Sequence, residues 1–231
     1  MYSAHLFVTL TPNMEKSASF LRLGTLSVGA LIWWLSMLCA CSENRTSVVL
    51  AGEEPFREGD LMLRCGYGAE SRVVTEASQS VYSHIGILHR DSLTCEWMVI
   101  HAVPGEAEQG EPEYVKCELL ATFYAPDRAV SGAWARVDCP DSIASAASHY
   151  AWQKAKEQVE FDNDYQLSDT TLLYCTELIW LAYLHQGIDL SDGHRHEVPT
   201  LISKDGECIF PSDIAESHQI QYVQPLKTQQ Q

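Results

Sequence analysis

The sequence of 231 residues predicts an α+β protein in which an antiparallel β-sheet packs against helices. Short apolar runs bounded by Gly, Pro or Asp recur between positions 61 and 137, which is typical of strands that pair with their neighbours. From position 142 onward the apolar residues recur with a helical period instead. The chain after position 41 is long enough for one domain with a sizeable core and too short for two.

The predicted strands follow one another closely along the chain. A Gly59-Asp60 turn leads into the first strand, and a Gly/Ser-rich loop over residues 66–80 separates it from the second. Alternation on the second strand puts His84 and Gly86 on one face and Ile85 on the other. The strands are predicted over residues 61–64, 82–88, 96–103, 113–120 and 132–137.

Two helices complete the predicted core. The first covers residues 142–158 and is rich in Ala, with Asp141 or Ser142 as its cap. The second covers residues 171–186 and ends at Gly187, a common stop signal. After Gly187 the chain is predicted to be mostly loop, with a helical turn over residues 212–215.

The first 41 residues are predicted to be a signal peptide with a lipobox. Residues 23–40 are uncharged and mostly apolar, and they end in Leu38-Cys39-Ala40-Cys41. This ending resembles that of bacterial lipoproteins, which implies cleavage before Cys41, lipid attachment to Cys41, and sorting to the outer membrane. Translation from Met14 is an alternative start. A retained anchor helix is the alternative to cleavage, although the apolar run is near the short end of the about 17 to 25 residues that a span needs.

Residues 42–55 are predicted to be a polar tether, and the domain is predicted to cover residues 56–231. The chain has a formal net charge of −16, and nucleic acid is therefore a poor candidate partner. Besides Cys39, Cys41 and Cys175, five cysteines remain, and an oxidising periplasm would permit disulfides among them. Their spacing matches no zinc pattern, so we expect no metal and no cofactor.

Cys175 is the candidate nucleophile. It lies where polar residues give way to a helical apolar pattern, so the thiol is expected in or near the first turn of a helix. Unpaired N–H groups and the helix dipole would lower the pKa of a thiol there. His84 is the candidate base, and a hairpin could bring His101 behind it to fix its tautomer.

The order and context of these residues resemble the permuted NlpC/P60 papain-like cysteine hydrolases, the YiiX/YebB-like group. In unpermuted relatives the cysteine precedes the histidine, whereas here the histidine comes first. The third position is often Glu in this group, where this chain has His101. The matching segments are Gly59-Asp60-Leu61, Ser83-His84-Ile85-Gly86-Ile87, Val99-Ile100-His101-Ala102, Phe161-Asp162-Asn163-Asp164-Tyr165 and Tyr174-Cys175-Thr176-Glu177-Leu178.

The resemblance implies a circularly permuted papain-like fold and a cysteine amidase or peptidase with Cys175, His84 and His101 as its catalytic residues. Its substrate would be a small peptide or an N-acyl compound, including fragments of peptidoglycan. Two alternatives are a lipid-directed acyltransferase or phospholipase of the lecithin-retinol-acyltransferase-like type, and a non-catalytic envelope binding protein.

Three further features were weighed. Tyr165 could help the Cys175 N–H to form an oxyanion hole, or it could be a buried loop aromatic. Glu177 is expected to be a structural acceptor rather than a catalyst. The run His194-Arg195-His196-Glu197 lacks a third convincing metal ligand.

Overall fold

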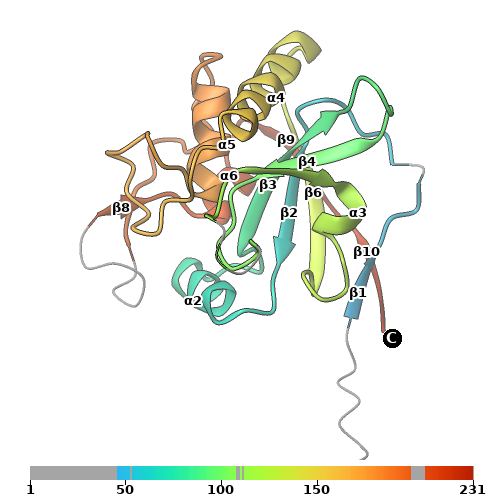
Figure 1. Cartoon of the computed structure of the whole chain (residues 1–231), viewed down its shortest axis with the longest axis horizontal. Coiled ribbons are helices and arrows are strands. Elements are labelled where there is room, and N and C mark those ends of the chain that lie inside the picture. The colour runs from blue at the N-terminus through green and yellow to red at the C-terminus, as the bar shows by residue number, and fades with distance from the viewer. Residues whose placement is uncertain (1–45, 53, 108–109, 111, 199–205, 231) are drawn as a thin grey trace, which may run out of the picture. The chain divides into compact units, whose positions relative to one another are not determined.

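The α+β class is confirmed in a computed structural model, which describes residues 46–52, 54–107, 110, 112–198 and 206–230. The predicted signal peptide and Cys41 lie outside the described residues. Six antiparallel strands form one sheet in the order β5-β4-β3-β2-β6-β9. The pairs β1–β10 and β7–β8 form two small ribbons (Figure 1). No helix of the described residues is long and apolar enough to cross a membrane.

The strands are β1 (Thr46–Val49), β2 (Leu61–Cys65), β3 (His84–Arg90), β4 (Trp97–His101), β5 (Lys116–Leu119), β6 (Ser131–Val137), β7 (His196–Glu197), β8 (Glu207–Cys208), β9 (Ile220–Pro225) and β10 (Lys227–Gln230). The helices are α2 (Ala69–Ser78), α3 (Leu120–Phe123), α4 (Asp141–Lys156), α5 (Cys175–Leu184) and α6 (Pro211–Ala215).

Alternation along the strands divides the sheet into two unlike faces. Leu61 and Leu63 of β2 point into one apolar cluster, together with buried residues of α4 and α5, and we call this side the helix face. Met62 points into a second cluster with Phe123 of α3, and we call this side the α3 face. Pairing of β3 with β4 extends the same division, because Ile87 lies opposite Ile100 and Leu88 opposite Val99.

The segment predicted as a loop over residues 66–80 contains helix α2. Gly68 lies at its N-cap, and Gln79 ends it in the left-handed conformation at φ 52°. Val74 is its buried residue. An amphipathic pattern needs several apolar positions on one side, so a helix that buries one side chain carries little periodic signal.

The C-terminal part is more regular than predicted. Strand β9 pairs with β6 and closes one edge of the sheet, although residues after 187 were expected to be mostly loop. Strand β10 pairs with β1, which lies within the segment predicted as a tether, so residues 46–49 lie against the domain. Strand β10 is polar and exposed, and β9 does not alternate strictly between apolar and polar residues, so neither strand carries the alternation that predicts a half-buried strand. The helical turn predicted over residues 212–215 is found as α6.

Candidate active site

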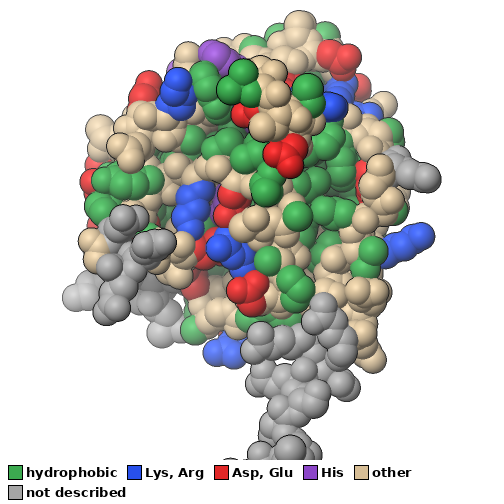
Figure 2. Space-filling model, turned by 45° about the vertical axis from the view of Figure 1, so that its right-hand side comes forward, with side chains coloured by type: hydrophobic (Ala, Val, Ile, Leu, Met, Phe, Trp, Pro, Cys, Tyr) green, Lys and Arg blue, Asp and Glu red, His purple; other side chains and the backbone are tan. Residues whose placement is uncertain are grey.

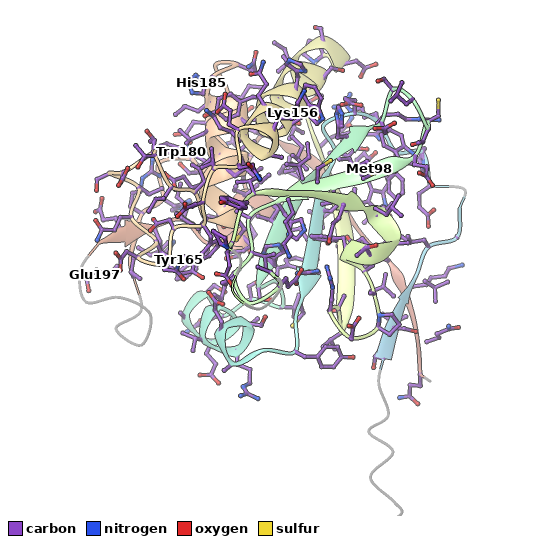
Figure 3. All side chains as sticks on the ribbon, viewed as in Figure 1. Met98, Lys156, Tyr165, Trp180, His185 and Glu197 are labelled. Atoms are coloured by element: carbon purple, nitrogen blue, oxygen red, sulfur yellow. The ribbon has the colours of Figure 1, made fainter. Side chains whose placement is uncertain are left out.

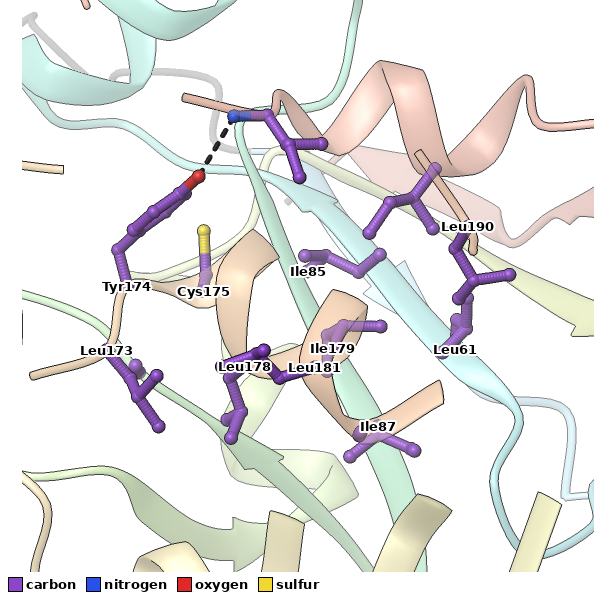
Figure 4. Close-up of a cluster of buried hydrophobic side chains, with 14 of the residues drawn as sticks. Leu61, Ile85, Ile87, Leu173, Tyr174, Cys175, Leu178, Ile179, Leu181 and Leu190 are labelled. Atoms are coloured by element: carbon purple, nitrogen blue, oxygen red, sulfur yellow. Dashed lines mark hydrogen bonds between the residues drawn. The ribbon is translucent and has the colours of Figure 1, made fainter. Parts of the chain in front are cut away.

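Cys175 is the first residue of α5, after the extended residue Tyr174 at the N-cap. The hydroxyl of Tyr174 accepts a 2.9 Å hydrogen bond from the N–H of Ile209, which fastens the start of the helix to the segment before α6. Apolar side chains of α5 pack on the helix face, and Figure 4 shows the Cys175 sulfur directed away from Leu178 and Ile179. Packing of the helix on the sheet thus fixes the thiol, although α5 begins four positions later than predicted.

Burial raises the pKa of the Cys175 thiol above its usual value. Hydrogen bonds from Thr176, whose Oγ1 is 3.6 Å from the sulfur, and from the backbone N–H of Ile85 act in the opposite direction without reversing the effect. The prediction of a lowered pKa was therefore wrong, because a helix N-terminus favours a thiolate only as far as water or charge can solvate it. The resting thiol is protonated.

His84 and His101 form a buried pair on the α3 face. The His84 Nε2 and His101 Nδ1 atoms are 2.8 Å apart, and both rings pack on Phe123. Gly86 makes this approach possible, since a Cβ atom there would lie 2.5 Å from a Val99 methyl carbon and 3.1 Å from the His101 Cβ atom. The hairpin therefore brings the two histidines together in the expected way.

Charged groups stand behind the pair. His101 Nε2 is 3.0 Å from Glu118 Oε1, and Arg128 donates to Glu118 Oε2 at 2.8 Å. Burial alone would raise the pKa of Glu118, but the hydrogen bond from His101 and the charge of Arg128 lower it to about 2. Burial, with help from the nearby Arg64, lowers the pKa of His84 well below its usual value. Both histidines are therefore neutral at pH 7.

One cavity of about 560 Å³ holds both the candidate nucleophile and the candidate base. Cys175 and His84 line it, and each is less than one-tenth exposed. The thiol comes from the helix face and lies beside the peptide that follows His84, whereas the imidazole belongs to the α3 face. Within the described residues the sulfur and the ring form no direct hydrogen bond, so the structure brings them to one cavity without joining them.

Tyr165 also lines this cavity. Its backbone has a φ of 55°, which is uncommon for a bulky residue, and its ring packs on Phe161 and Tyr174. Figure 3 shows it in the loop beside α2. Strained residues of this kind cluster at functional sites, although strain alone assigns no role.

Glu177 lies one half-turn beyond the nucleophile and is fully buried. Neither carboxyl oxygen has a hydrogen-bond partner among the described residues. Burial and the nearby Asp162 raise its pKa to about 9, so the side chain is a neutral acid at pH 7. The backbone N–H of Tyr174 acts on this pKa in the opposite direction, so the expectation that Glu177 is a structural acceptor stays a prediction.

No protein-family model matches the sequence, and no curated protein matches it. Among solved structures, the fold is similar to the crystal structure of the metalloprotein yiiX (DUF1105) from Escherichia coli O157:H7. The TM-score is 0.58 and the identity 16%, over 75% of this chain and 97% of that chain. The similarity shows a fold shared with yiiX.

The name of this relative raises the question whether the present chain could hold a metal ion. Among the described residues, His101, Glu106 and Glu118 bring one ligand atom each within 4.8 Å of one another. Arg128 already donates to both carboxylates, at 2.9 and 2.8 Å, and Arg64 donates to Glu106 at 2.5 Å. These residues do not fit a metal ion. The carboxylate oxygens of Glu106 and Glu118 already accept hydrogen bonds from guanidinium groups, and the His101 imidazole faces an oxygen of Glu118.

His196 of the histidine-rich run lies on β7. His196 Nε2 is 3.0 Å from Asp213 Oδ1, and this pair joins β7 to α6. Four charged residues of the cluster behind the histidine pair were not predicted from the sequence: Arg64, Glu106, Glu118 and Arg128. The surface charge does not mark the position of this cluster either, since Figure 2 shows acidic and basic side chains intermingled on the visible face.

Proposed function

We propose that this protein is a cysteine-dependent hydrolase that cleaves an amide bond of a small peptide or N-acyl compound. The observation that carries the proposal is the chain of polar contacts from Glu118 through His101 to His84, which ends at the cavity that holds Cys175. A neutral imidazole and a neutral thiol that line one cavity can act as a base and a nucleophile by exchanging one proton.

In the proposed reaction His84 takes the thiol proton on Nδ1, because its Nε2 is engaged with His101. The sulfur attacks the carbonyl carbon, and the C–N bond breaks as His84 returns the proton to the leaving amine. Water, deprotonated by His84, then hydrolyses the thioester and restores the thiol. Since the thiol is protonated at rest, substrate binding must bring sulfur and imidazole together for the first step.

The tetrahedral oxyanion needs donors that are in place beforehand. We assign the backbone N–H of Cys175 to this role, because the first N–H groups of a helix have no intrahelical partner. The hydroxyl of Tyr165 is the second proposed donor, since this residue lines the same cavity.

The test is turnover of a panel of peptidoglycan peptides, N-acyl amides and phospholipids by residues 46–231. Cys175→Ala should abolish turnover without loss of fold. Cys208→Ala is the matched control, since Cys208 is another buried cysteine that lines the cavity. A Cys175→Ala variant with near-wild-type turnover would contradict the proposal, and a panel without any turnover would favour a binding protein.

A lipid-directed acyltransferase or phospholipase is the second candidate. One wall of the cavity is apolar, which suits an acyl chain. The panel separates the two, since only this second activity would release fatty acid from the phospholipids. The apolar wall includes Phe161, Val198, Ile209 and Phe210.

We also propose that the fold is a circular permutation of the NlpC/P60 papain-like fold. Histidine on β3 before cysteine at the start of α5 supports this order. The sequence further supports a lipid anchor on Cys41 in the bacterial outer membrane, with the domain facing the periplasm. Acyl chains contribute about 0.8 kcal/mol per buried CH₂ group, which is enough to hold an acidic domain at a membrane.

Mass spectrometry of the mature protein tests the anchor. We expect an acylated Cys41 with no residue before it, and release of the Cys41→Ser variant from membranes. A mature chain that keeps residues 14–40 and an unmodified Cys41 would favour the retained anchor helix instead.

A further inference from the structure

The acidic and basic groups behind the histidine pair are more than a salt-bridge cluster. Among the described residues, Glu118 of β5 is the carboxylate that hydrogen-bonds His101, and Arg128 joins it to Glu106. Arg64 forms an ion pair with the same Glu106. Its guanidinium group lies 4.5 Å from the centre of the Phe123 ring, and that ring packs against both imidazoles. Arg64, Glu106, Arg128 and Glu118 therefore form one connected network of ion pairs, which meets the histidine pair where Glu118 contacts His101.

Hydrogen-bond direction follows from the charge of Glu118. Its carboxylate has no proton at neutral pH and can only accept, so Nε2 of His101 must donate to it. A neutral imidazole carries one proton, which leaves His101 Nδ1 as an acceptor. His84 Nε2, 2.8 Å away, must then donate, and His84 Nδ1 is left without a proton.

We propose that Glu118 is a positioning residue that fixes the tautomer of His84 through the imidazole of His101. The inference rests on the proposed function for its catalytic meaning, because an unprotonated Nδ1 is what the Cys175 proton requires. Without Glu118, His101 could carry its proton on Nδ1 and donate to His84 Nε2. His84 Nδ1 would then hold the proton of the neutral ring and could not act as a base.

The proton balance supports this division of roles. When the thiol proton moves to His84 Nδ1, His84 becomes an imidazolium and its Nε2–H continues to donate to His101. His101 and Glu118 keep their protonation states, so neither residue has to gain or lose a proton. The negative charge of Glu118 stabilises the imidazolium, and Arg128 keeps that carboxylate in place at 2.8 Å.

Two measurements test the proposal without any substrate. The ¹⁵N chemical shifts of the His84 ring report which nitrogen is protonated. The rate of Cys175 alkylation by iodoacetamide against pH reports whether His84 can take the thiol proton when this small amide reagent enters the cavity. Alkylation is followed on the Cys175 peptide by mass spectrometry, since other thiols are present. We expect wild-type His84 to carry its proton on Nε2 alone.

Glu118→Ala should give a mixture of His84 tautomers and reduce Cys175 alkylation at neutral pH by about 10-fold or more. Glu58→Gln is the matched control, because Glu58 pairs with His89 at 2.7 Å at the other end of β3. This control should leave both readouts unchanged. A Glu118→Ala protein with the wild-type tautomer and the wild-type alkylation profile would overturn the proposal.

Should Glu118→Ala fail to fold, Glu118→Gln still decides. Its amide oxygen can accept from His101, so the tautomer should persist, but loss of the charge should move the alkylation profile to higher pH. An unmoved profile would overturn the proposal. If the wild type cleaves no member of the substrate panel yet shows these dependences, the hydrolase assignment fails and the role of Glu118 stands.

Discussion

The two faces of the six-stranded sheet differ in what holds their candidate site residues in place. On the helix face, Leu61, Leu63 and Ile85 are fully buried against α4 and α5, and this packing positions Cys175. On the α3 face, His84 and His101 stand among apolar neighbours and are backed by charged groups. The position of Cys175, the proposed nucleophile, thus depends on the core, whereas that of His84, the proposed base, depends on a polar network across the same strands.

This difference predicts that substitutions on the two faces have different effects. A change on the helix face should lower stability and leave the chemistry of the imidazole pair intact. A change on the α3 face should alter protonation even where stability survives. The following variants test that separation, beginning with the largest expected effect.

Replacement of His84 should have the largest effect on turnover. His84→Asn removes the proposed base while keeping a polar side chain, so activity should fall on the order of 10² to 10⁴-fold. The measurement is kcat/KM on whichever substrate the panel identifies. His185→Asn, on an exposed histidine outside the cavity, is the control, and an equal loss there would show a non-specific effect.

His101→Glu sharpens the comparison. Glu at this position is frequent in the family that the sequence resembles, and that resemblance alone predicts that the variant retains activity. The structure changes this expectation, because the new carboxylate would face Glu118, now 3.0 Å from the His101 ring. Two carboxylates in a buried site repel each other, which raises the pKa of one of them.

We therefore expect His101→Glu to lose most activity and the double variant His101→Glu with Glu118→Gln to regain part of it. Turnover and the His84 tautomer are measured in both proteins. A single variant as active as the wild type would show that the network tolerates a second carboxylate, and the argument from repulsion would be wrong.

Features that depend on neighbours in the sequence were predicted, whereas features that depend on residues distant in the sequence were missed. Alternation on β3 predicted that His84 and Gly86 share a face, because this signal is local, and the structure shows that the missing Cβ of Gly86 admits the His101 side chain. Glu118 and Arg128 gave no signal, since their partners lie on other elements. Alternating burial in β5 makes Glu118 look like an ordinary half-exposed side chain of an edge strand.

A paired substitution tests the faces through stability. Ile87→Ala on the helix face should lower the free energy of unfolding by about 2–5 kcal/mol, because it empties a fully buried site. The ¹⁵N chemical shifts of its His84 ring should not change. Phe123→Leu, which removes the ring that packs on both imidazoles, should instead move those shifts. Denaturant titration and the ¹⁵N shifts of both variants decide whether the effects separate, and moved His84 shifts in Ile87→Ala would contradict the separation.

Glu177 provides the smallest effect and a distinct pH signature. Its pKa is about 9 in the folded protein because of burial and Asp162, against 4.5 in the unfolded chain. Between these two values the folded state binds a proton that the unfolded state has lost, so this group makes stability fall as pH rises from about 4.5 to 9. Glu177→Gln cannot ionise and should remove that part of the pH dependence. We expect the variant to gain about 1–3 kcal/mol relative to the wild type at pH 8, a gain that disappears near pH 4. Unfolding by urea at several pH values measures the difference, and equal slopes against pH in the two proteins would show that Glu177 is ionised or paired in the folded state.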